Sequence, residues 1–510
     1  MAGRIGAGDA PRETIGRRRR GLHLARWFVA ALALAAIALS LAMLEREEGR
    51  VETRALDVGT TPATLFARPG VTEAPVAVIA HGFAGSQQFM QGFAYTLARA
   101  GYVAVTFDFE GHGRNTVPMS GDVTEIDGTT RRLISETDRV IAAARAAPEA
   151  GEGLALVGHS MATDVIVRTA LQRGDVDALV AVSMYSEAVT ATEPDNLLIV
   201  TGQWEPALRE VAREALREVD SAADEGQTAQ GAVTRRAVVA PLAEHVGVLY
   251  ATETLRETRA WLDRAFDRDS DAPIVRRGPW VALLMGGIVA LAWPLFSLLP
   301  ARSGARVPGW RAVATAGVVP ALATPLALWP VETDILPVLV ADYLALHLAL
   351  YGLLQLGVLA ALGIRPALRP VWPGLALAAY GIGVFGFALD QYGASFMPHA
   401  GRLPVIAAVS LGAVPFMLAD AVATAGGAAP LARRLAVRAA LFASLALAVA
   451  LDFEGLFFLI LIIPIILLFF LVFGTMGGWV GRRAGPVAMG LGLGLVLGWA
   501  IGVSFPLFAA

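Results

Sequence analysis

A serine set between small residues is the clearest sign of chemistry in this sequence. Ser160 lies in the segment 158–162 (GHSMA), which follows an apolar run at 154–157 and opens a helix-like stretch at 161–173. A strand, a tight turn and a helix in this order raise a serine clear of the backbone, provided that its near neighbours are small. The segment therefore predicts a nucleophilic serine. A serine that only caps the following helix is the alternative.

A nucleophilic serine needs a base, and histidine is the usual one. His159 adjoins the serine, so we expect the turn to direct it away. His81 and His112 lie in His-Gly loops that precede the serine. Only His245 follows it in this part of the chain, after the last predicted strand at 236–240. The sequence therefore predicts His245 as the base. A histidine that only lies on the surface is the alternative.

The acid that orients the base should follow another strand. Glu205 comes shortly after the apolar run 197–201, and active sites of open α/β sheets lie at the carboxyl ends of their strands. The order serine, glutamate, histidine is that of one hydrolase architecture. Asp195, which lies before the same strand, is the alternative acid. Glu205 could also serve only to stabilise a helix N-terminus through the helix dipole.

The elements that would position these residues lie between 50 and 272, where the composition is that of a soluble domain. Near-continuous apolar strands alternate there with amphipathic helices, which predicts an α/β fold with a mostly parallel sheet covered on both faces. The predicted strands are 76–80, 102–109, 154–158, 178–183, 197–201 and 236–240, after a leading antiparallel pair at 51–58 and 63–68; the predicted helices are 88–100, 130–147, 161–173 and 252–266.

Several motifs of this domain occur together in one known family. The segment 76–85 (VAVIAHGFAG) is a strand with a His-Gly loop, 107–114 (FDFEGHGR) contains a D-x-x-G-H-G loop, and 158–162 is the serine turn. With Glu205 and His245 following in order, residues 60–268 resemble the α/β-hydrolase family of serine esterases and lipases. Ala162 and Glu205 stand where that family more often has glycine and aspartate.

The resemblance implies a doubly wound sheet and a role for each site residue. Ser160 would be the nucleophile, His245 the general base and then acid, and Glu205 the residue that orients His245. The backbone N–H groups of Phe83 and Met161 would form the oxyanion hole. The family's motif glycines are Gly82 and Gly158 here. Only 185–196 is available for a cap domain, so we expect an open site, or one roofed by 206–235 or by a membrane.

Much of the remaining chain is apolar enough to face lipid. The chain has 510 residues, of which 55% are hydrophobic. Residues 1–26 are polar and carry a run of four arginines at 17–20, and the uncharged segment 27–44 that follows can span a bilayer. Basic residues before this segment and acidic ones after it place the N-terminus in the cytoplasm. We predict an uncleaved anchor rather than a signal peptide, which puts 50–272 outside the cytoplasm.

Residues 280–508 predict an all-α domain of eight further spans, nine in total. The predicted spans are 280–299, 312–330, 336–362, 372–389, 403–424, 436–451, 455–474 and 486–508. Alternate loops are basic, and these loops carry Arg302, Arg306, Arg311, Arg365, Arg369, Arg433, Arg434, Arg438, Arg482 and Arg483. The other loops carry Glu332, Asp334, Asp390, His399, Asp452 and Glu454. This alternation predicts a C-terminus on the outer side of the membrane, with Arg276, Arg277 and Arg402 as exceptions. The excess of alanine and glycine and the absence of lysine suggest a bacterial protein, so we expect this membrane to be a bacterial plasma membrane.

Ionisable residues inside spans are costly and suggest function. Asp342, His347 and Asp420 are candidates for an intramembrane polar site, in which Asp420 would pair with one of the other two across helices. A structural hydrogen bond between helices is the alternative.

Composition narrows the possible functions. The net charge of -3 and the lack of a basic tract beyond the N-terminus argue against nucleic acid as a partner. The absence of cysteine and lysine excludes thiolate chemistry and a Schiff-base lysine. We predict a serine hydrolase without metal or cofactor, acting on a carboxylic ester, with lipid esters favoured by the membrane tether. Peptidase and thioesterase activities remain open. The rival function is a transporter or lipid-handling protein with the domain as a binding or regulatory module.

Overall fold

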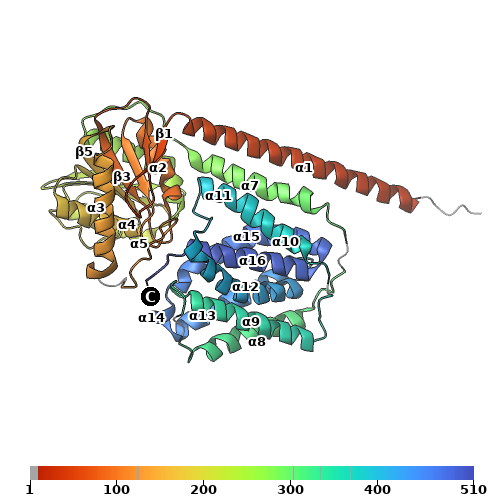
Figure 1. The fold of residues 1–510 in the computed structure, drawn as a ribbon. Helices are drawn as coiled ribbons and strands as arrows, with labels where there is room; N and C mark the ends of the chain where they lie inside the picture. Colours follow the sequence, from red (N-terminus) through yellow and green to blue (C-terminus); the bar gives the residue numbers. More distant parts are fainter. Residues whose placement is uncertain (1–9, 123–125, 302–303, 333–334, 368, 510) are drawn as a thin grey trace, which may run out of the picture.

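The computed structural model describes residues 10–122, 126–301, 304–332, 335–367 and 369–509. Arg302 and Asp334, which contribute to the predicted charge alternation, lie outside these residues. The chain forms a sheet-containing domain that sits at one end of a bundle of long apolar helices (Figure 1).

The domain is organised around a nine-stranded sheet with the order β1-β2-β4-β3-β5-β6-β7-β9-β8. From β4 through β9 the neighbouring strands run parallel, while β1, β2 and β8 pair antiparallel with their neighbours. This confirms the predicted doubly wound, mostly parallel sheet. Only β8 was not predicted, because three residues are too few to show a period. The strands are β1 Glu52–Leu56, β2 Ala63–Ala67, β3 Ala74–Ala80, β4 Val103–Phe107, β5 Ala150–His159, β6 Ala178–Val182, β7 Asn196–Gly202, β8 Thr228–Gln230 and β9 Thr234–Ala240.

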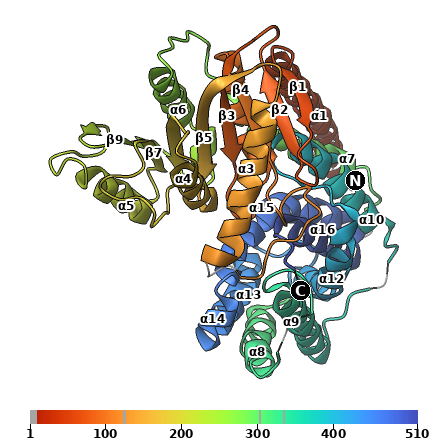
Figure 2. The same ribbon diagram turned by 60° about the vertical axis from the view of Figure 1, so that its left-hand side comes forward.

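Helices cover both faces of the sheet, and alternate strand residues enter two separate cores. In β3, Val78 packs in the core beneath α3, α4 and α5, whereas Ile79 packs in the core beneath α2 and α6. This is the consequence of side chains pointing to opposite faces along a strand. The helices of the domain are α2 Gln91–Arg99, α3 Arg131–Arg145, α4 Met161–Arg173, α5 Pro206–Arg217 and α6 Thr252–Ala265, with short helices η1 Gln87–Met90, η2 Ile126–Thr130 and η3 Gly247–Tyr250. Figure 2 shows β7, β9 and α5 extending away from the helical bundle.

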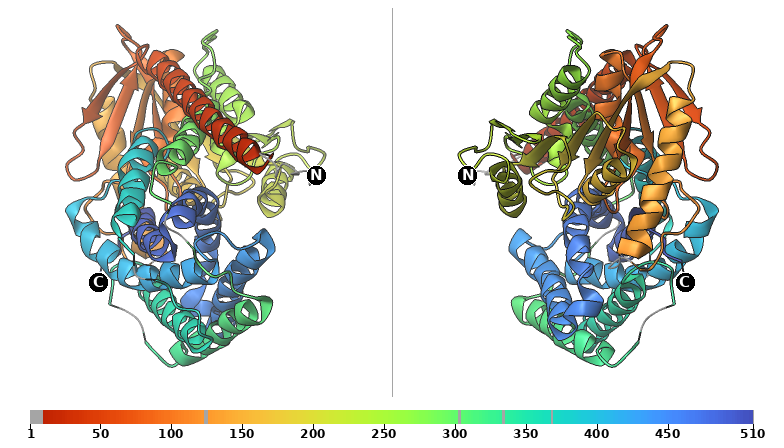
Figure 3. Two further views of the ribbon diagram at one scale, coloured as in Figure 1. Left: turned by 90° about the vertical axis from the view of Figure 1, so that its right-hand side faces the viewer. Right: turned by 90° about the vertical axis from the view of Figure 1, so that its left-hand side faces the viewer.

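Among the described residues, nine helical segments are long and apolar enough to cross a membrane. The bundle contains α1 Ala10–Glu48, α7 Arg277–Phe296, α8 Trp310–Leu328, α9 Ala341–Ala361, α10 Trp372–Ala379, η4 Tyr380–Gly386, α11 Phe387–Tyr392, η5 Ala400–Arg402, α12 Leu403–Ala423, α13 Leu431–Leu451, α14 Phe453–Leu456, α15 Leu459–Ala484 and α16 Pro486–Ser504. Helix α1 lies at the outside of the molecule and packs along α7 (Figure 3). The nine helices match the nine predicted spans, although α15 runs on well beyond its predicted end at 474.

Two arginines that broke the predicted charge alternation lie in the junction between domain and bundle. Arg402 is buried and donates hydrogen bonds to the carbonyl oxygens of Gly111 (2.8 Å) and Phe505 (2.6 Å). Arg277, also buried, pairs with Glu48 at 2.9 Å and lies over the ring of Tyr95. Both arginines are therefore held by contacts within the protein.

The C-terminal tail holds the same junction together. The Leu507 amide donates to the Gly111 carbonyl (2.9 Å), and the Met119 amide donates back to the Leu507 carbonyl (2.8 Å). Ala509 adds a third bond, from its amide to the Met119 carbonyl at 2.7 Å. The tail thus pairs like a short strand with the loop that follows β4, whose end lies beside the predicted site.

Candidate active site

The serine turn has the strained geometry that its sequence predicts. Strand β5 ends at His159, helix α4 begins at Met161, and Ser160 between them has φ 53° and ψ -118°. A positive φ is unfavourable for a residue with a side chain, so the surrounding packing must hold it. A Cβ on Gly158 would lie 2.8 Å from the Ala162 carbonyl oxygen, and one on Gly82 would lie 2.9 Å from Ser160 Cβ. Neither position therefore has room for the Cβ of any residue other than glycine.

The structure brings Ser160, His245 and Glu205 into one hydrogen-bonded series. Nε2 of His245 lies 2.9 Å from Ser160 Oγ, and its Nδ1 lies 2.6 Å from Glu205 Oε1. Because a carboxylate only accepts, Nδ1 carries the proton and Nε2 can accept the serine proton. The His245 side chain is 45% exposed, so substrate can reach it, while that of Glu205 is buried. Asp195, the alternative acid, is exposed at the opposite end of β7.

Two further groups hold the glutamate. Oε2 of Glu205 accepts hydrogen bonds from the Gly202 amide (2.6 Å) and from the Ser183 hydroxyl (2.8 Å). Burial alone would raise the pKa of Glu205, but the hydrogen bonds from His245, Gly202 and Ser183 outweigh it and lower that pKa below its ordinary value. Sequence reasoning missed Ser183. Its position directly after β6, at the same edge of the sheet, was the available clue.

His159 also has a role that sequence reasoning missed. Its Nε2 donates to the backbone carbonyl of His245 at 2.9 Å, and the two rings lie 4.9 Å apart between centroids. Burial, with the nearby His245 as a second cause, lowers the pKa of His159 to about 3. A histidine that stays neutral can support the loop carrying His245 without adding charge beside it.

The predicted oxyanion donors flank the serine. Phe83 follows Gly82, where an added Cβ would lie 2.9 Å from Ser160 Cβ, and Met161 is the next residue after the serine. Within the described part of the chain, neither backbone N–H donates to another protein atom. The loop is fixed in a turn by a bond from the Gly85 amide to the Gly82 carbonyl (3.0 Å). Two free amides beside a serine can receive the negative oxygen of a tetrahedral intermediate.

The two remaining histidines of the domain form hydrogen bonds in or to the loop after β4, which contains His112, whereas His81 itself follows β3. Nδ1 of His112 lies 2.9 Å from the Glu110 carbonyl oxygen, and Nε2 of His81 accepts from the Phe109 amide at 3.2 Å. Asp108 accepts from the amides of Gln87 (2.8 Å) and Arg114 (3.0 Å). These residues support the loop.

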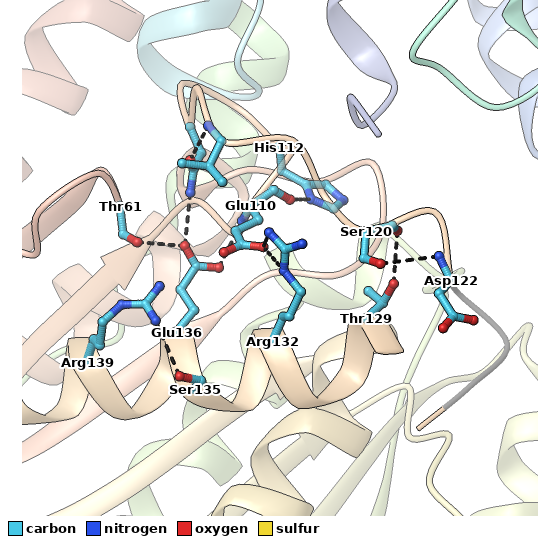
Figure 4. Close-up of polar contacts among 12 residues, drawn as sticks. Thr61, Glu110, His112, Ser120, Asp122, Thr129, Arg132, Ser135, Glu136 and Arg139 are labelled. Carbon is cyan, nitrogen blue, oxygen red and sulfur yellow. Dashed lines mark hydrogen bonds and ion pairs between the residues drawn. The ribbon is translucent and has the colours of Figure 1, made fainter. Parts of the chain in front are cut away.

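A buried glutamate of α3 forms hydrogen bonds to the loop that follows β4. Glu136 of α3 accepts hydrogen bonds from the Thr61 hydroxyl (2.6 Å), the Glu110 amide (2.8 Å) and the Asn115 side chain (3.0 Å), and Figure 4 shows it between Thr61 and Glu110. Burial raises the pKa of Glu136 to about 7, although the bonds from Thr61 and Glu110 partly oppose the shift. Nothing in the sequence pattern indicated this residue.

Large apolar side chains stand exposed around the site. Trp204, beside Glu205, is 59% exposed, and Leu242, in the loop before His245, is 75% exposed. Tyr185 and Val246 are exposed on the same side of the sheet, after β6 and β9. Only residues 183–195 join β6 to β7, which leaves the site without a cap domain from that connection. We call the four exposed residues Tyr185, Trp204, Leu242 and Val246 the apolar rim.

The three predicted intramembrane polar residues are not brought together. Asp342 accepts from the amides of Ile335 and Leu336, and His347 lies 3.0 Å from the Ser444 hydroxyl. Asp420 pairs with Arg438 at 3.3 Å, so its predicted pairing with Asp342 or His347 was wrong. Arg438 was expected in a loop but lies within α13. A buried carboxylate is stabilised most by an opposite charge, so Asp420 pairs with Arg438 rather than with Asp342 or His347.

Comparison with known proteins finds one family model that matches part of the sheet-containing domain. Residues 73–224 match the family model described as serine aminopeptidase, S33. The domain has the α/β-hydrolase fold. A search of curated proteins found no match to this sequence.

Solved structures similar to the hydrolase domain include several hydrolases. They include dienelactone hydrolase from Anabaena variabilis (18% identity, TM-score 0.30, 42% of this chain and 98% of that one). A membrane phospholipase A described as a bacterial virulence factor has 16% identity and TM-score 0.33, over 49% of this chain and 99% of that one. Est1E from Butyrivibrio proteoclasticus has 13% identity and TM-score 0.30, over 42% and 99%. Each similarity extends over less than half of this chain.

Proposed function

We propose that this protein is a membrane-anchored serine hydrolase that cleaves carboxylic esters with an apolar acyl group. The observation that carries the proposal is the series Ser160–His245–Glu205, with bonds of 2.9 and 2.6 Å. A serine hydroxyl hydrogen-bonded to a histidine, which a buried carboxylate orients, is the arrangement that activates a serine as a nucleophile.

The reaction follows from these contacts. Nε2 of His245 takes the proton of Ser160 as Oγ attacks the acyl carbon, and the amides of Phe83 and Met161 donate to the resulting oxyanion. The intermediate collapses when its bond to the leaving alcohol breaks and His245 gives the proton to that alcohol. Water then attacks the acyl-enzyme, His245 takes its proton and returns it to Ser160 Oγ, and the carboxylic acid leaves.

The apolar rim supports an ester with an acyl chain as the substrate. Trp204 and Leu242 are largely exposed, and exposed apolar groups of this size around a reactive centre fit a hydrocarbon chain. A peptide with a charged N-terminus gains little from such a surface. A lipid ester fits best, because the domain is joined to helices that suit a bilayer.

The distribution of charge supports a domain outside the cytoplasm of a bacterial cell. Helix α7 starts at the junction with the domain and ends at Phe296, so the loop that follows it, and every second loop thereafter, lies at the far end of the bundle. Arg306, Arg365 and Arg369 line a cavity of about 240 Å³ there. Basic loops face the cytoplasm, which favours a domain on the outer side of the plasma membrane.

The contacts of the intramembrane polar groups give the transporter alternative no support. Asp342, His347 and Asp420 each have a partner within the protein, and none of the three contacts another of them. Ion and proton pathways place such groups along a common cavity.

The test uses the full chain in nanodiscs and a fluorophosphonate probe that reacts with activated serines. We expect labelling of the wild-type protein and none of Ser160→Ala. A panel of matched esters, thioesters and aminoacyl amides then identifies the bond that is cleaved, and we expect esters to be turned over fastest. Folded wild-type protein that is neither labelled nor active on any member of the panel would contradict the proposal.

A further inference from the structure

The helical bundle reaches a residue of the candidate oxyanion hole. The ring of Phe458, just before α15, lies 5.6 Å from the ring of Phe83 between centroids. Phe83 provides one of the two free amides and follows Gly82, where an added Cβ would lie only 2.9 Å from Ser160 Cβ. The bundle therefore contributes a side chain beside the reaction centre, which a simple anchor would not need.

Phe458 is the inner member of a series of three aromatic rings. The ring of Phe457 lies 5.8 Å from that of Phe458, and the ring of Phe453 lies 5.6 Å from that of Phe457. Exposure increases along the series. Phe458 is partly buried, Phe457 is 43% exposed and Phe453 is 60% exposed. The rings thus form a continuous apolar surface from the outside of the bundle to Phe83, here called the phenylalanine track.

The position of the phenylalanine track fits the boundary of a bilayer. It includes α14 and ends at the start of α15, which is one of the nine candidate spans, and the other end of α15 carries Arg482 and Arg483. Asp452 and Glu454 lie beside it and mark the polar side of the boundary. Exposed apolar rings at this depth are stabilised when the hydrocarbon of a bilayer, rather than water, lies against them.

The reactive edge of the sheet faces this end of the bundle. The contacts to the bundle include Gln88 with the Asp390 carbonyl (3.1 Å), Arg114 with the Asp390 carboxylate (2.6 Å) and Gly111 with Arg402. All of these domain residues follow the carboxyl ends of β3 and β4. Because Ser160, Glu205 and His245 follow the carboxyl ends of parallel strands in the same sheet, they lie at the same edge.

We infer that the phenylalanine track is the binding surface by which the acyl chain of a bilayer lipid reaches Ser160. This inference rests on the proposed function and specifies its substrate as an ester embedded in the outer leaflet. A chain leaving the bilayer would contact Phe453, then Phe457, then Phe458, and so remain on apolar surface up to the oxyanion loop. Each contact offsets the cost of exposing the chain to water.

The test compares two esters with the same leaving group, using the full chain in nanodiscs of phosphatidylglycerol and phosphatidylethanolamine. One is soluble 4-methylumbelliferyl butyrate and the other is membrane-embedded 4-methylumbelliferyl oleate. For the double variant Phe453→Ala/Phe457→Ala, we expect the ratio of kcat/KM for oleate to that for butyrate to fall about tenfold. The variant Phe453→Leu/Phe457→Leu retains an apolar surface and should keep most of the ratio.

The matched control is Phe28→Ala, which removes an exposed phenylalanine from α1. It should leave the ratio at its wild-type value. An unchanged ratio in the double alanine variant, or an equal loss on both esters, would overturn the inference. Failure of the wild-type protein to cleave either ester would instead count against the proposed hydrolase function.

Discussion

The guanidinium group of Arg402, at the start of α12, donates a hydrogen bond to the carbonyl oxygen of Gly111 in the loop after β4. The same carbonyl accepts the Leu507 amide, so the bundle and the C-terminal tail meet at one atom of the hydrolase domain. This loop also contains His112, whose ring lies 5.8 Å from that of Phe83. The bundle therefore holds a loop that supports the candidate oxyanion hole.

Replacement of this arginine should loosen the loop. In Arg402→Gln, the shorter side chain cannot reach both Gly111 and Phe505, and buried carbonyl oxygens lose a charged donor. Bonds of this kind contribute roughly 1.5–3 kcal/mol each. We expect amide hydrogen exchange over 109–119 to accelerate about tenfold or more, while exchange in α4 stays unchanged. Arg311→Gln, at the far end of the bundle, is the control. Unchanged exchange in the loop would show that Arg402 does not hold it.

Gly82→Ala should abolish most activity without unfolding the domain. The new Cβ would lie 2.9 Å from Ser160 Cβ and 3.0 Å from His159 Nδ1, so the serine turn or the oxyanion loop must move. A displacement of about 1 Å at a reactive centre costs on the order of 100-fold in rate. The measurement is kcat on a soluble ester. Gly121→Ala, where the nearest atom is 3.8 Å away, should keep wild-type activity. A Gly82→Ala protein with wild-type kcat would refute the assigned oxyanion loop.

Ser183→Ala should change the pH dependence of the reaction. Its hydroxyl is one of the donors that keep the pKa of Glu205 low, so its loss raises that pKa. As the pH falls, Glu205 is then protonated sooner and ceases to orient His245. We expect a modest loss of kcat/KM at pH 8 and an acid limb displaced to higher pH. A profile that drops equally at every pH would indicate a structural role only.

Glu136 should make the stability of the hydrolase domain depend on pH. Its folded-state pKa of about 7 lies above the ordinary value of 4.5, so the folded domain binds its proton more tightly than the unfolded chain. The stabilisation is complete below pH 4.5 and is lost as the pH rises to 7, at about 1.4 kcal/mol per unit of pKa difference. Thermal unfolding followed between pH 5 and 8 should therefore show a decreasing Tm.

The variant Glu136→Gln cannot titrate and supplies the control for this dependence. It should be less stable at pH 5, because its amide group faces the donors of Thr61, Glu110 and Asn115. Its Tm should also vary less between pH 5 and 8 than that of the wild-type protein. An equal variation in both proteins would place the titrating group elsewhere.

Local patterns were enough to predict the fold and the three principal site residues. Apolar runs that alternate with amphipathic segments indicated the strands and a mostly parallel sheet, and the small residues at 158–162 indicated the serine turn. His245 and Glu205 could be predicted because the carboxyl ends of parallel strands lie at one edge of the sheet. This rule can be applied from the order of the strands along the chain alone. The nine spans were predicted from apolar length and the placement of arginines.

Such local patterns could not predict contacts between segments that lie far apart in the sequence. Arg402 and Arg277 looked like exceptions to a charge rule, yet each is buried against the other part of the protein. Asp420 was expected to pair with His347 or Asp342, but it meets Arg438, which the sequence had suggested for a loop. Glu136 gave no periodic or motif signal, because its importance comes from a loop more than twenty residues away that folds over it.

The sequence by itself determined which residue types stand at the carboxyl ends of which strands, and that decided the class of chemistry. Only the tertiary structure decided what surrounds them. It set Ser183 against Glu205, His159 against the His245 loop and Phe458 against Phe83, because side-chain contacts depend on the packing of whole elements. The spacing of apolar residues along a segment indicates that the segment is a strand. The same spacing carries no information about a residue from another domain that packs against it.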